Sequence, residues 1–350
     1  MKGYVFLGDK EIDFVEKPTP TPGPGEALIK EKTSALCGSD LHVYRAPKAY
    51  RSSCTHTYTG HEPVGEVIAV GEGVQWPKVG DRVVGYHALG CGECRYCQTR
   101  EFKKCPHNFI APPDDPERVA MMENRDGSNA DHFVAKSGQL LPLPDDFSYE
   151  DGSVLSCNFG TAWSAIKTGS CFPGGTIALW GLGPVGLNIV LIAKKLGMRV
   201  IGIDLSSARC DFAREAGADE VIDGSQTDAV EKLLSLTGGE GADTVIDTTG
   251  AGPVHERLVE ATRLGGHIVL VGMGHETSVG PVPAIILRQV TIHGSWIYDI
   301  ADWWPMLEFV RQHEIDLMSC VEEVVPISQF PEKIEKADKG ECGKIIFRWD

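Results

Sequence analysis

Four of the eleven cysteines of this 350-residue chain lie within a stretch of fifteen residues. They are separated by two, two and seven residues, and they are Cys91, Cys94, Cys97 and Cys105. Thiolates at this spacing on a short loop can all reach one metal ion, which predicts a closed, structural zinc site in a lobe at 90–106. A disulfide-bonded lobe and an iron–sulfur cluster are the alternatives, although the usual cluster motif has a shorter last spacing.

Composition limits the partners that this chain can have. The 33 basic and 49 acidic residues give a net charge of −16, which disfavours binding to nucleic acid and to anionic membranes. The length predicts two domains, and 42% apolar residues suffice for two cores. No apolar run could span a bilayer, and the start of the chain lacks the apolar core of a secretion signal. We therefore expect a cytoplasmic protein whose cysteines are metal ligands or buried thiols.

The pattern of apolar residues changes near residue 155. Before it, short β-rich segments interrupted by Gly and Pro predict an irregular antiparallel barrel. From residue 176 onward, apolar strands alternate with amphipathic helices, which predicts a doubly wound α/β sheet. The expected strands of both parts are 27–30, 65–70, 81–84, 177–180, 200–203, 220–222, 244–246 and 268–271. The expected helices are 185–196, 206–216, 227–237 and 253–264. The last fifty residues, with a helix near 302–313 and a strand at 344–347, are assigned to the first domain.

A glycine-rich turn opens the α/β domain. It reads Gly181-Leu182-Gly183-Pro184-Val185-Gly186, and it follows an apolar strand and begins a helix. In this context, bare backbone and a helix N-terminus can bind a pyrophosphate. The next strand ends at Asp204, whose carboxylate can accept both adenosine ribose hydroxyls and would repel a 2′-phosphate. The motif predicts NAD rather than NADP. Arg209, one helical turn further on, lies against the adenosine or is an ordinary exposed arginine.

Two short stretches of the first domain are rich in metal-binding side chains. They read Cys37-Gly38-Ser39-Asp40-Leu41-His42 and Gly60-His61-Glu62. Together they hold a thiol, a hydroxyl, two carboxylates and two imidazoles. Their occurrence beside a cysteine-rich lobe and a dinucleotide turn predicts a second metal site with an open position.

With these motifs, the sequence resembles the zinc-dependent alcohol dehydrogenases of the medium-chain dehydrogenase/reductase family over essentially its whole length. The resemblance rests on residues 37–42 and 60–62, the lobe, Leu155-Ser156-Cys157 with Thr161, residues 181–186, and Gly343-Lys344. It implies an α/β protein with a GroES-like β-rich catalytic domain, residues 1–158 and 297–350. It also implies a doubly wound Rossmann coenzyme domain, residues 159–296.

The resemblance implies a role for each matching residue at the metal site. Cys37, His61 and Cys157 correspond to the protein ligands of a catalytic zinc, whose fourth position takes water or the alcohol oxygen. Glu62 corresponds to a neighbouring acid that in some relatives becomes an alternate ligand, and Asp40 to the carboxylate that fixes the ligand imidazole. Polyol-oxidising relatives often carry a carboxylate near position 157, so a buried structural cysteine is the alternative there.

The resemblance also implies how protons and the cofactor are handled. Ser39 corresponds to the first hydroxyl of a proton relay that ends at His42, a side chain whose ordinary pKa is close to neutral. Thr161 corresponds to a residue beside the nicotinamide, and Lys344 to a cation near the pyrophosphate. The candidate cofactor-binding residues are Gly181, Leu182, Gly183, Pro184, Val185, Gly186, Asp204, Arg209, Val271, Thr161 and Lys344.

The expected function is NAD- and zinc-dependent oxidation of a small-molecule alcohol, with two zinc ions per chain. His87, where relatives place a bulky pocket residue, favours a secondary alcohol or a polyol, and the loop at 111–125 either shapes specificity or is a surface loop. We expect a homo-oligomer, a dimer or a tetramer, in which a strand at 285–292 pairs across an interface or belongs to the core. The alternatives are a zinc-independent reductase of the same superfamily and a non-catalytic NAD-binding redox sensor. The candidate ligands argue against the reductase, and the Ser39 and His42 relay argues against the sensor.

Overall fold

The computed structural model describes residues 1–51, 57–88, 90–111, 125–274 and 278–349. Most of the loop expected at 111–125 lies outside these residues. The chain forms two compact units, the first of Met1–Cys157, Asp299–Pro305 and Val321–Asp350, and the second of Asn158–Tyr298 and Met306–Cys320. Among the helices in the described ranges, none combines the length and the apolar character needed to cross a membrane.

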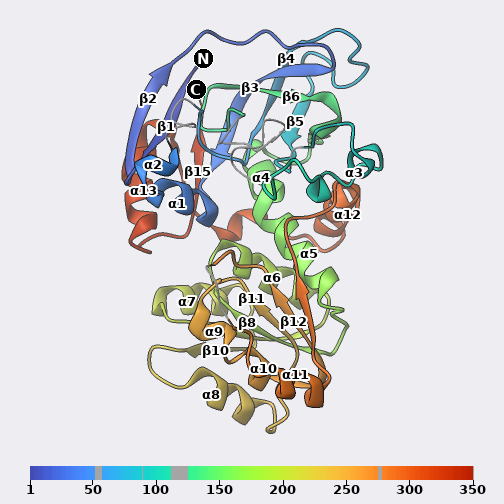
Figure 1. The fold of residues 1–350 in the computed structure, drawn as a ribbon, viewed down its shortest axis with the longest axis vertical. Helices are drawn as coiled ribbons and strands as arrows, with labels where there is room; N and C mark the ends of the chain where they lie inside the picture. The colour runs from blue at the N-terminus through green and yellow to red at the C-terminus, as the bar shows by residue number, and fades with distance from the viewer. Residues whose placement is uncertain (52–56, 89, 112–124, 275–277, 350) are drawn as a thin grey trace. The chain divides into compact units, whose positions relative to one another are not determined.

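The first unit consists mainly of strands. Its large sheet has the order β14-β15-β3-β4-β5-β7, with β6 paired to β3, and a separate hairpin joins β1 to β2. The strands are β1 (Lys2–Gly8), β2 (Glu11–Glu16), β3 (Glu26–Ala35), β4 (Val64–Val70), β5 (Arg82–Gly85), β6 (His132–Lys136), β7 (Leu140–Pro142), β14 (Val321–Pro326) and β15 (Lys344–Arg348). The final strand, red in Figure 1, pairs antiparallel with the blue β3, so the end of the chain returns to the first unit.

Short helices connect these strands. They are α1 (Gly38–Arg45), α2 (Lys48–Arg51), α3 (Arg95–Gln98), α4 (Tyr149–Val154) and α13 (Phe330–Asp338). The α1 helix begins directly after Cys37, because the Asp40 carboxylate accepts a hydrogen bond from the Cys37 backbone N–H at 2.8 Å. A π-helical turn, Leu155–Phe159, follows α4 and contains Cys157. Both candidate thiol ligands are therefore carried at helical turns.

The second unit is a parallel sheet with helices on both faces. Its order is β10-β9-β8-β11-β12-β13, and every neighbouring pair is parallel. The strands are β8 (Thr176–Trp180), β9 (Arg199–Asp204), β10 (Glu220–Asp223), β11 (Ala242–Asp247), β12 (Thr262–Leu270) and β13 (Thr291–Gly294). This order is that of a doubly wound dinucleotide-binding sheet, as the sequence predicted.

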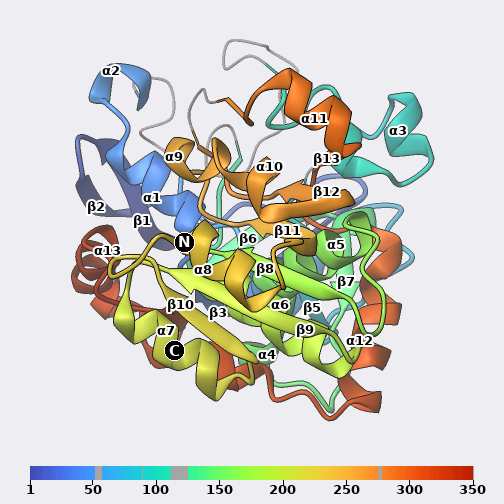
Figure 2. The ribbon, with the colours of Figure 1, turned by 90° about the horizontal axis from the view of Figure 1, so that it is seen from below.

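The helices of the second unit cover both sides of that sheet. They are α5 (Gly160–Thr168), α6 (Pro184–Lys195), α7 (Ser207–Glu215), α8 (Ala229–Leu236), α9 (Gly252–His255), α10 (Leu258–Ala261) and α11 (Val282–Arg288), while α12 (Trp303–Gln312) has its first residues in the first unit and the rest in the second. Figure 2 shows α7 on one side of the strands and α10 and α11 on the other. The core between them is aliphatic and includes Ile201, Val245 and Ile268.

Two expected elements are wrong. The strand expected at 285–292 is instead α11 followed by β13, because Pro281 caps a helix and Pro283 lies in its first turn, where proline is tolerated. Gln289 then ends α11 in the left-handed region, with φ of 55°. The helix expected at 253–264 is two short helices, α9 and α10, and the second ends before 264 because β12 begins at Thr262, which pairs with Ala242 of β11.

The assignment of all of residues 297–350 to the first domain also differs from the structure. Met306–Cys320 belongs to the second unit. The α12 helix begins in the first unit, where Trp303 Nε1 donates a hydrogen bond to the Pro142 carbonyl at 2.9 Å. It continues in the second unit, where the Phe309 ring meets the edge of Trp163, with ring centroids 5.2 Å apart.

Candidate metal centres and dinucleotide site

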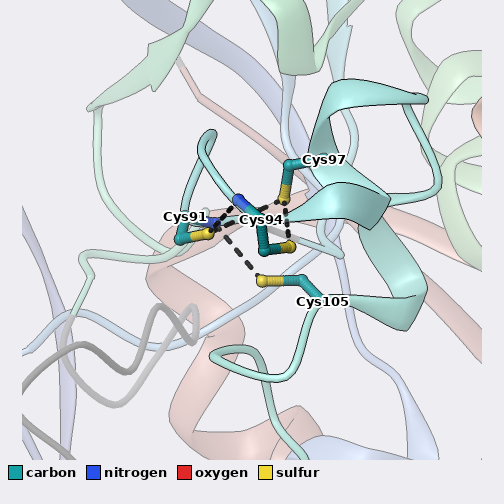
Figure 3. Close-up of side chains that lie close together, drawn as sticks. All are labelled: Cys91, Cys94, Cys97 and Cys105. Carbon is teal, nitrogen blue, oxygen red and sulfur yellow. Dashed lines mark hydrogen bonds between the residues drawn. The ribbon is translucent and has the colours of Figure 1, made fainter.

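The four lobe cysteines converge. Figure 3 shows Cys91, Cys94, Cys97 and Cys105 with their sulfur atoms directed toward one another. The Cys94 and Cys97 sulfurs are 3.5 Å apart and those of Cys91 and Cys97 are 4.0 Å apart, while four thiolates around one zinc lie about 3.8 Å apart. The four lobe cysteines carry free thiols, so the disulfide alternative is not supported.

Backbone groups prepare the lobe for a cation. The Cys94 N–H donates to Cys91 Sγ at 3.4 Å, and the Cys91 N–H donates to Cys105 Sγ at the same distance. Burial raises the pKa of the Cys91 thiol, but hydrogen bonds from the N–H groups of Glu93 and Cys94, together with those from the Cys105 and Cys94 thiols, outweigh burial and lower that pKa to about 7. A thiolate is the form that binds a metal, so this donor set fits the expected structural zinc.

A second cluster lies in the same unit. Cys37, His61, Glu62 and Cys157 each direct one ligand atom to a region in which all four atoms lie within 4.8 Å of one another. Cys157 Sγ is 3.9 Å from Cys37 Sγ and 3.7 Å from His61 Nε2. Two thiols and an imidazole are donors that zinc prefers, so these side chains fit the expected catalytic metal.

The charges of this cluster favour a cation. The hydrogen bond from Cys157 lowers the pKa of Cys37 well below its ordinary value, and His61 contributes in the same direction. The pKa of Cys157 is raised well above its ordinary value, first by its hydrogen bond to Cys37 and then by burial. Cys37 thus loses its proton more readily than Cys157, and both thiols must be deprotonated when a divalent metal binds the two sulfurs.

Asp40 holds two of the candidate ligands at once. Its side chain is completely buried, with Oδ1 3.1 Å from His61 Nδ1 and Oδ2 accepting from the Cys37 N–H. Burial lowers the pKa of His61, but the Asp40 charge and hydrogen bond outweigh burial and raise it. The contact expected between Asp40 and the His61 imidazole is therefore present, and it leaves Nε2 directed toward Cys157.

A buried ion pair adjoins the cluster. The Lys344 ammonium donates to the Glu62 carboxylate and, at 3.2 Å, to the Leu36 carbonyl, and both charged side chains are buried. Burial raises the pKa of Glu62 to about 7, although the Lys344 charge opposes that rise. The sequence suggested Lys344 as a cation near the pyrophosphate, and that contact stays a prediction. Sequence reasoning missed the pair with Glu62, although a lysine at the start of an apolar strand is a signal that a buried carboxylate faces it.

Ser39 and His42 lie one helical turn apart on α1. Ser39 Oγ is 3.3 Å from His61 Nε2, and His42 is exposed. Residues at this spacing share one side of a helix. On this helix, Ser39 thus lies beside the metal cluster and His42 lies at the surface.

His87 lies directly beside the cluster. Its ring meets the ring of His61 edge-on at a centroid distance of 5.2 Å, and the residue is 4% exposed. Burial and the neighbouring His61 lower the pKa of His87 to about 3, so its imidazole is neutral. Among the described residues, Nδ1 has no hydrogen-bond partner. The ring beside the candidate ligands thus carries a neutral, buried nitrogen without a partner among the described residues.

The glycine turn lies at the carboxyl end of β8. Gly181 has φ of 91°, in the region that favours glycine, and Gly183 caps α6 with Pro184 in its first turn. Asp204 ends the neighbouring β9, where its carboxylate accepts from the Leu182 N–H at 2.8 Å. The expected carboxylate is therefore in contact with the turn, at the sheet edge where dinucleotides bind.

The other candidate cofactor residues lie in the same unit. Arg209 Nη1 is 4.0 Å from the Asp204 carboxylate. Val271 directly follows β12, and its N–H donates to the Asp247 carbonyl at 2.9 Å. Thr161 is buried on α5. Contact of these three residues with a cofactor stays a prediction.

Comparison with known proteins identifies the family. The family model described as "Alcohol dehydrogenase GroES-like domain" matches residues 23–145, and "Zinc-binding dehydrogenase" matches residues 184–312. A sorbitol dehydrogenase of Halalkalibacterium halodurans is 31% identical over 338 residues, which cover 95% of this chain and 94% of the relative. The chain belongs to the zinc-type medium-chain alcohol dehydrogenases. Membership confirms the resemblance, the fold class and a zinc-dependent oxidoreductase function.

More distant relatives of this zinc-type alcohol dehydrogenase extend the comparison. An L-threonine 3-dehydrogenase of Rhizobium etli is 29% identical over 339 residues, covering 95% of this chain and 93% of the relative. A solved structure of an NAD-dependent alcohol dehydrogenase superposes with a TM-score of 0.85 at 28% identity, covering 100% of both chains. The similar proteins thus include one named as the dehydrogenase of a polyol, one named as the dehydrogenase of a hydroxy amino acid, and one described as NAD-dependent.

Proposed function

We propose that this zinc-type alcohol dehydrogenase oxidises a secondary alcohol or a polyol to the ketone or aldehyde, with NAD as the hydride acceptor. The observation that carries the proposal is the convergence of Cys37, His61 and Cys157 in one cluster, in which His61 and Cys157 are buried and Cys37 is partly buried. These three residues would hold a catalytic zinc, with Glu62 as an alternate ligand. The four lobe cysteines would hold a structural zinc, giving two ions per chain.

The chain's own residues prepare the metal site. A zinc ion bound there supplies a Lewis acid that polarises a substrate hydroxyl and lowers its pKa. Asp40 fixes the His61 ring and the Cys37 backbone, so the ligands are held in one geometry before metal or substrate binds. Lys344 forms an ion pair with Glu62. While this pair is intact, the Glu62 carboxylate does not compete with Cys37, His61 and Cys157 for the zinc ion.

Proton removal is assigned to α1. The Ser39 hydroxyl beside His61 would accept the substrate proton while it releases its own proton, and the released proton would leave for solvent at His42, one helical turn away. His42 is suited to this step because the ordinary pKa of histidine lies near neutral pH. The spacing of the two residues on one helix supports the relay.

The preference for NAD is assigned to Asp204. Its carboxylate contacts the glycine turn through the Leu182 N–H, so its charge lies where the adenosine ribose is expected. A 2′-phosphate would meet that negative charge, whereas the two ribose hydroxyls of NAD can donate to it. Arg209, beside the carboxylate, is placed to lie against the adenosine.

The substrate class is assigned from His87. A neutral ring nitrogen beside the metal ligands can bond a second hydroxyl of the substrate, and an unused polar atom there would cost stability. Sorbitol and L-threonine, for which two relatives are named, both carry hydroxyls on secondary carbons. This supports a secondary alcohol or a polyol over a simple primary alcohol.

A homo-oligomer is also proposed, with α11 and β13 at its interface. β13 lies at one edge of the second unit's sheet, and α11 exposes Ile286 and Leu287, at 66% and 78%. An apolar helix surface beside an unpaired sheet edge is a surface that a second copy of the chain can cover.

The test is the zinc content per chain, measured together with NADH formation from sorbitol, L-threonine, 2-butanol and ethanol. We expect two zinc ions and faster turnover of at least one secondary alcohol than of ethanol. Cys157→Ser should retain one zinc and lose turnover, while Cys171→Ser, outside both clusters, should retain both zincs and activity. One zinc and no turnover in the natural protein would favour the redox-sensor alternative, and full activity of Cys157→Ser would contradict the ligand assignment.

A further inference from the structure

We infer that Asp247 and His255 form a positioning pair that holds the wall of the dinucleotide site, an inference that rests on the proposed use of NAD. Asp247 ends β11 and His255 ends α9, and both side chains are buried. His255 Nε2 lies 2.8 Å from Asp247 Oδ2, and in this hydrogen bond the ring N–H donates to the carboxylate oxygen. Neither residue takes part in the chemistry described above.

The Asp247 carboxylate organises the loop that follows β11. Oδ1 accepts from the Thr249 N–H at 3.0 Å and from the Thr249 hydroxyl at 2.5 Å. Oδ2 accepts from the Gly250 N–H at 3.0 Å as well as from His255. Four donors on one carboxylate fix the backbone of residues 248–250, and His255 is the only one of the four that comes from outside this loop.

This loop lies between two other loops of the same sheet edge. On one side, the Thr248 hydroxyl donates to the Gly181 carbonyl at 3.0 Å, and a Cβ added to Gly181 would collide with Thr248. On the other side, a Cβ added to Gly272 or Gly274 would collide with the backbone of Gly250. The loop thus separates the glycine turn after β8 from the segment after β12.

The position of this loop matters for cofactor binding. Dinucleotides bind at the carboxyl edge of such a sheet, where the loops after β8, β11 and β12 meet. Because the Gly181 turn is in contact with Thr248, a displacement of residues 248–250 would also displace the turn that receives the pyrophosphate. The pair therefore acts on the cofactor through the loop, without contacting it.

The second nitrogen of His255 supports a role beyond packing. Nδ1 is buried and has no hydrogen-bond partner among the described residues. A buried polar atom without a partner destabilises a fold, so an apolar residue would serve better if position 255 only filled space. The histidine is accounted for if its other nitrogen is needed to hold Asp247 and the loop.

The experiment compares three variants of the full chain by NADH binding, with NADH fluorescence as the readout. His255→Leu removes the donor and should weaken NADH binding by about tenfold. Turnover at saturating NAD, the KM of the alcohol and the zinc content should change by less than about twofold. His255→Gln places an amide N–H where Nε2 lies and should restore binding, whereas His255→Asn is polar but too short to reach Asp247 and should not.

Thr262→Val is the matched control. The Thr262 hydroxyl donates to the Leu258 carbonyl at 2.7 Å and is buried at the opposite end of β12, so this variant loses a buried hydrogen bond of the same unit away from the loop. Its NADH affinity should not change. Unchanged affinity in His255→Leu, or an equal loss in Thr262→Val, would overturn the inference. If His255→Leu does not fold, equal affinities of the Gln and Asn variants would overturn it.

A second readout separates this inference from the proposed function. Amide hydrogen exchange at residues 248–250 is measured without cofactor, and it should be faster in His255→Leu than in Thr262→Val. A natural protein that binds no NADH would contradict the proposed function, and exchange would then decide the positioning role alone. Equal exchange in the two variants would overturn that role, whether or not the protein binds NADH.

Discussion

Asp40 shows how one buried residue determines a metal site. Its two carboxylate oxygens engage candidate ligands that are 24 positions apart in the chain, Cys37 and His61. A neutral side chain would lack the negative charge that strengthens both hydrogen bonds, and a shorter side chain would not reach both partners. The sequence placed Asp40 near the site by resemblance, but the contact to the Cys37 backbone appears only in the structure.

Asp40→Asn should therefore weaken zinc binding at the catalytic site. We expect a loss of about 10- to 100-fold in zinc affinity, because the His61 ring loses its charged partner. Competition with a chelator, with zinc per chain as the readout, measures this loss. Asp131→Asn is the control, because Asp131 also pairs with a histidine, His132 at 2.8 Å, outside both clusters. Equal zinc loss in the two variants would contradict the role of Asp40.

Glu31 is a buried acid that destabilises the fold as pH rises. Burial raises its pKa well above the ordinary value, although a hydrogen bond from the Val64 N–H opposes this rise. The folded protein thus binds a proton that the unfolded chain releases near its ordinary pKa. The contribution of protonated Glu31 to the free energy of unfolding is therefore fully present below the ordinary pKa, and it is lost as the pH rises through the raised pKa of the folded protein.

Glu31→Gln removes this dependence, since glutamine stays neutral. The variant should be more stable than the natural protein at pH 8, by about 1–3 kcal/mol in the free energy of unfolding, with a smaller difference at pH 5. Urea unfolding at both pH values measures it. A difference that shrinks from pH 5 to pH 8 would contradict the assignment.

At the scale of the element, α1 links the metal cluster to solvent. His42→Ala should slow alcohol oxidation mainly near neutral pH, and high pH or added buffer base should partly restore the rate, because solution base can replace the lost relay step. Initial rates between pH 6 and pH 10, with and without imidazole, test this. An equal loss at every pH would show that His42 is not part of the proton path.

The carboxyl ends of β9 and β10 offer a matched pair for cofactor choice. Asp204 and Asp223 end these strands side by side in register, and the Asp204 carboxylate accepts from the Leu182 N–H of the glycine turn, whereas that of Asp223 accepts from Ser225. Asp204→Asn should weaken the binding of NAD, reduce the preference for NAD over NADP and leave the zinc content unchanged. Asp223→Asn should leave the ratio of kcat/KM for the two cofactors unchanged. An unaltered ratio in Asp204→Asn would mean that another residue sets the preference.

At the scale of the whole molecule, the proposed oligomer depends on the exposed apolar side of α11. Leu287→Asp should give a smaller species in sedimentation velocity, because a buried charge without a partner opposes association. Val79→Asp, which alters an exposed apolar residue of the first unit, should not change the assembly. A natural protein that sediments as a monomer would contradict the proposed interface.

The amino-acid sequence by itself determined the features that depend on short stretches of chain. The spacing of the lobe cysteines, the glycine turn after β8 and the alternation of strands and helices follow from local backbone geometry, and all three could be read in advance. Where local signals conflicted, as between the apolar run and the prolines around 281–292, the expected strand was wrong because the proline signals outweighed it.

Only the tertiary structure decided which distant residues meet. Cys37 and Cys157 are 120 positions apart, and Glu62 and Lys344 are 282 apart, yet each pair is in contact. Asp247 and His255 are close in sequence, but their common loop takes its place from contacts with the glycine turn and the segment after β12. Such contacts depend on the order of the strands in each sheet and on the return of the last strand to the first sheet. No local sequence pattern encodes that return.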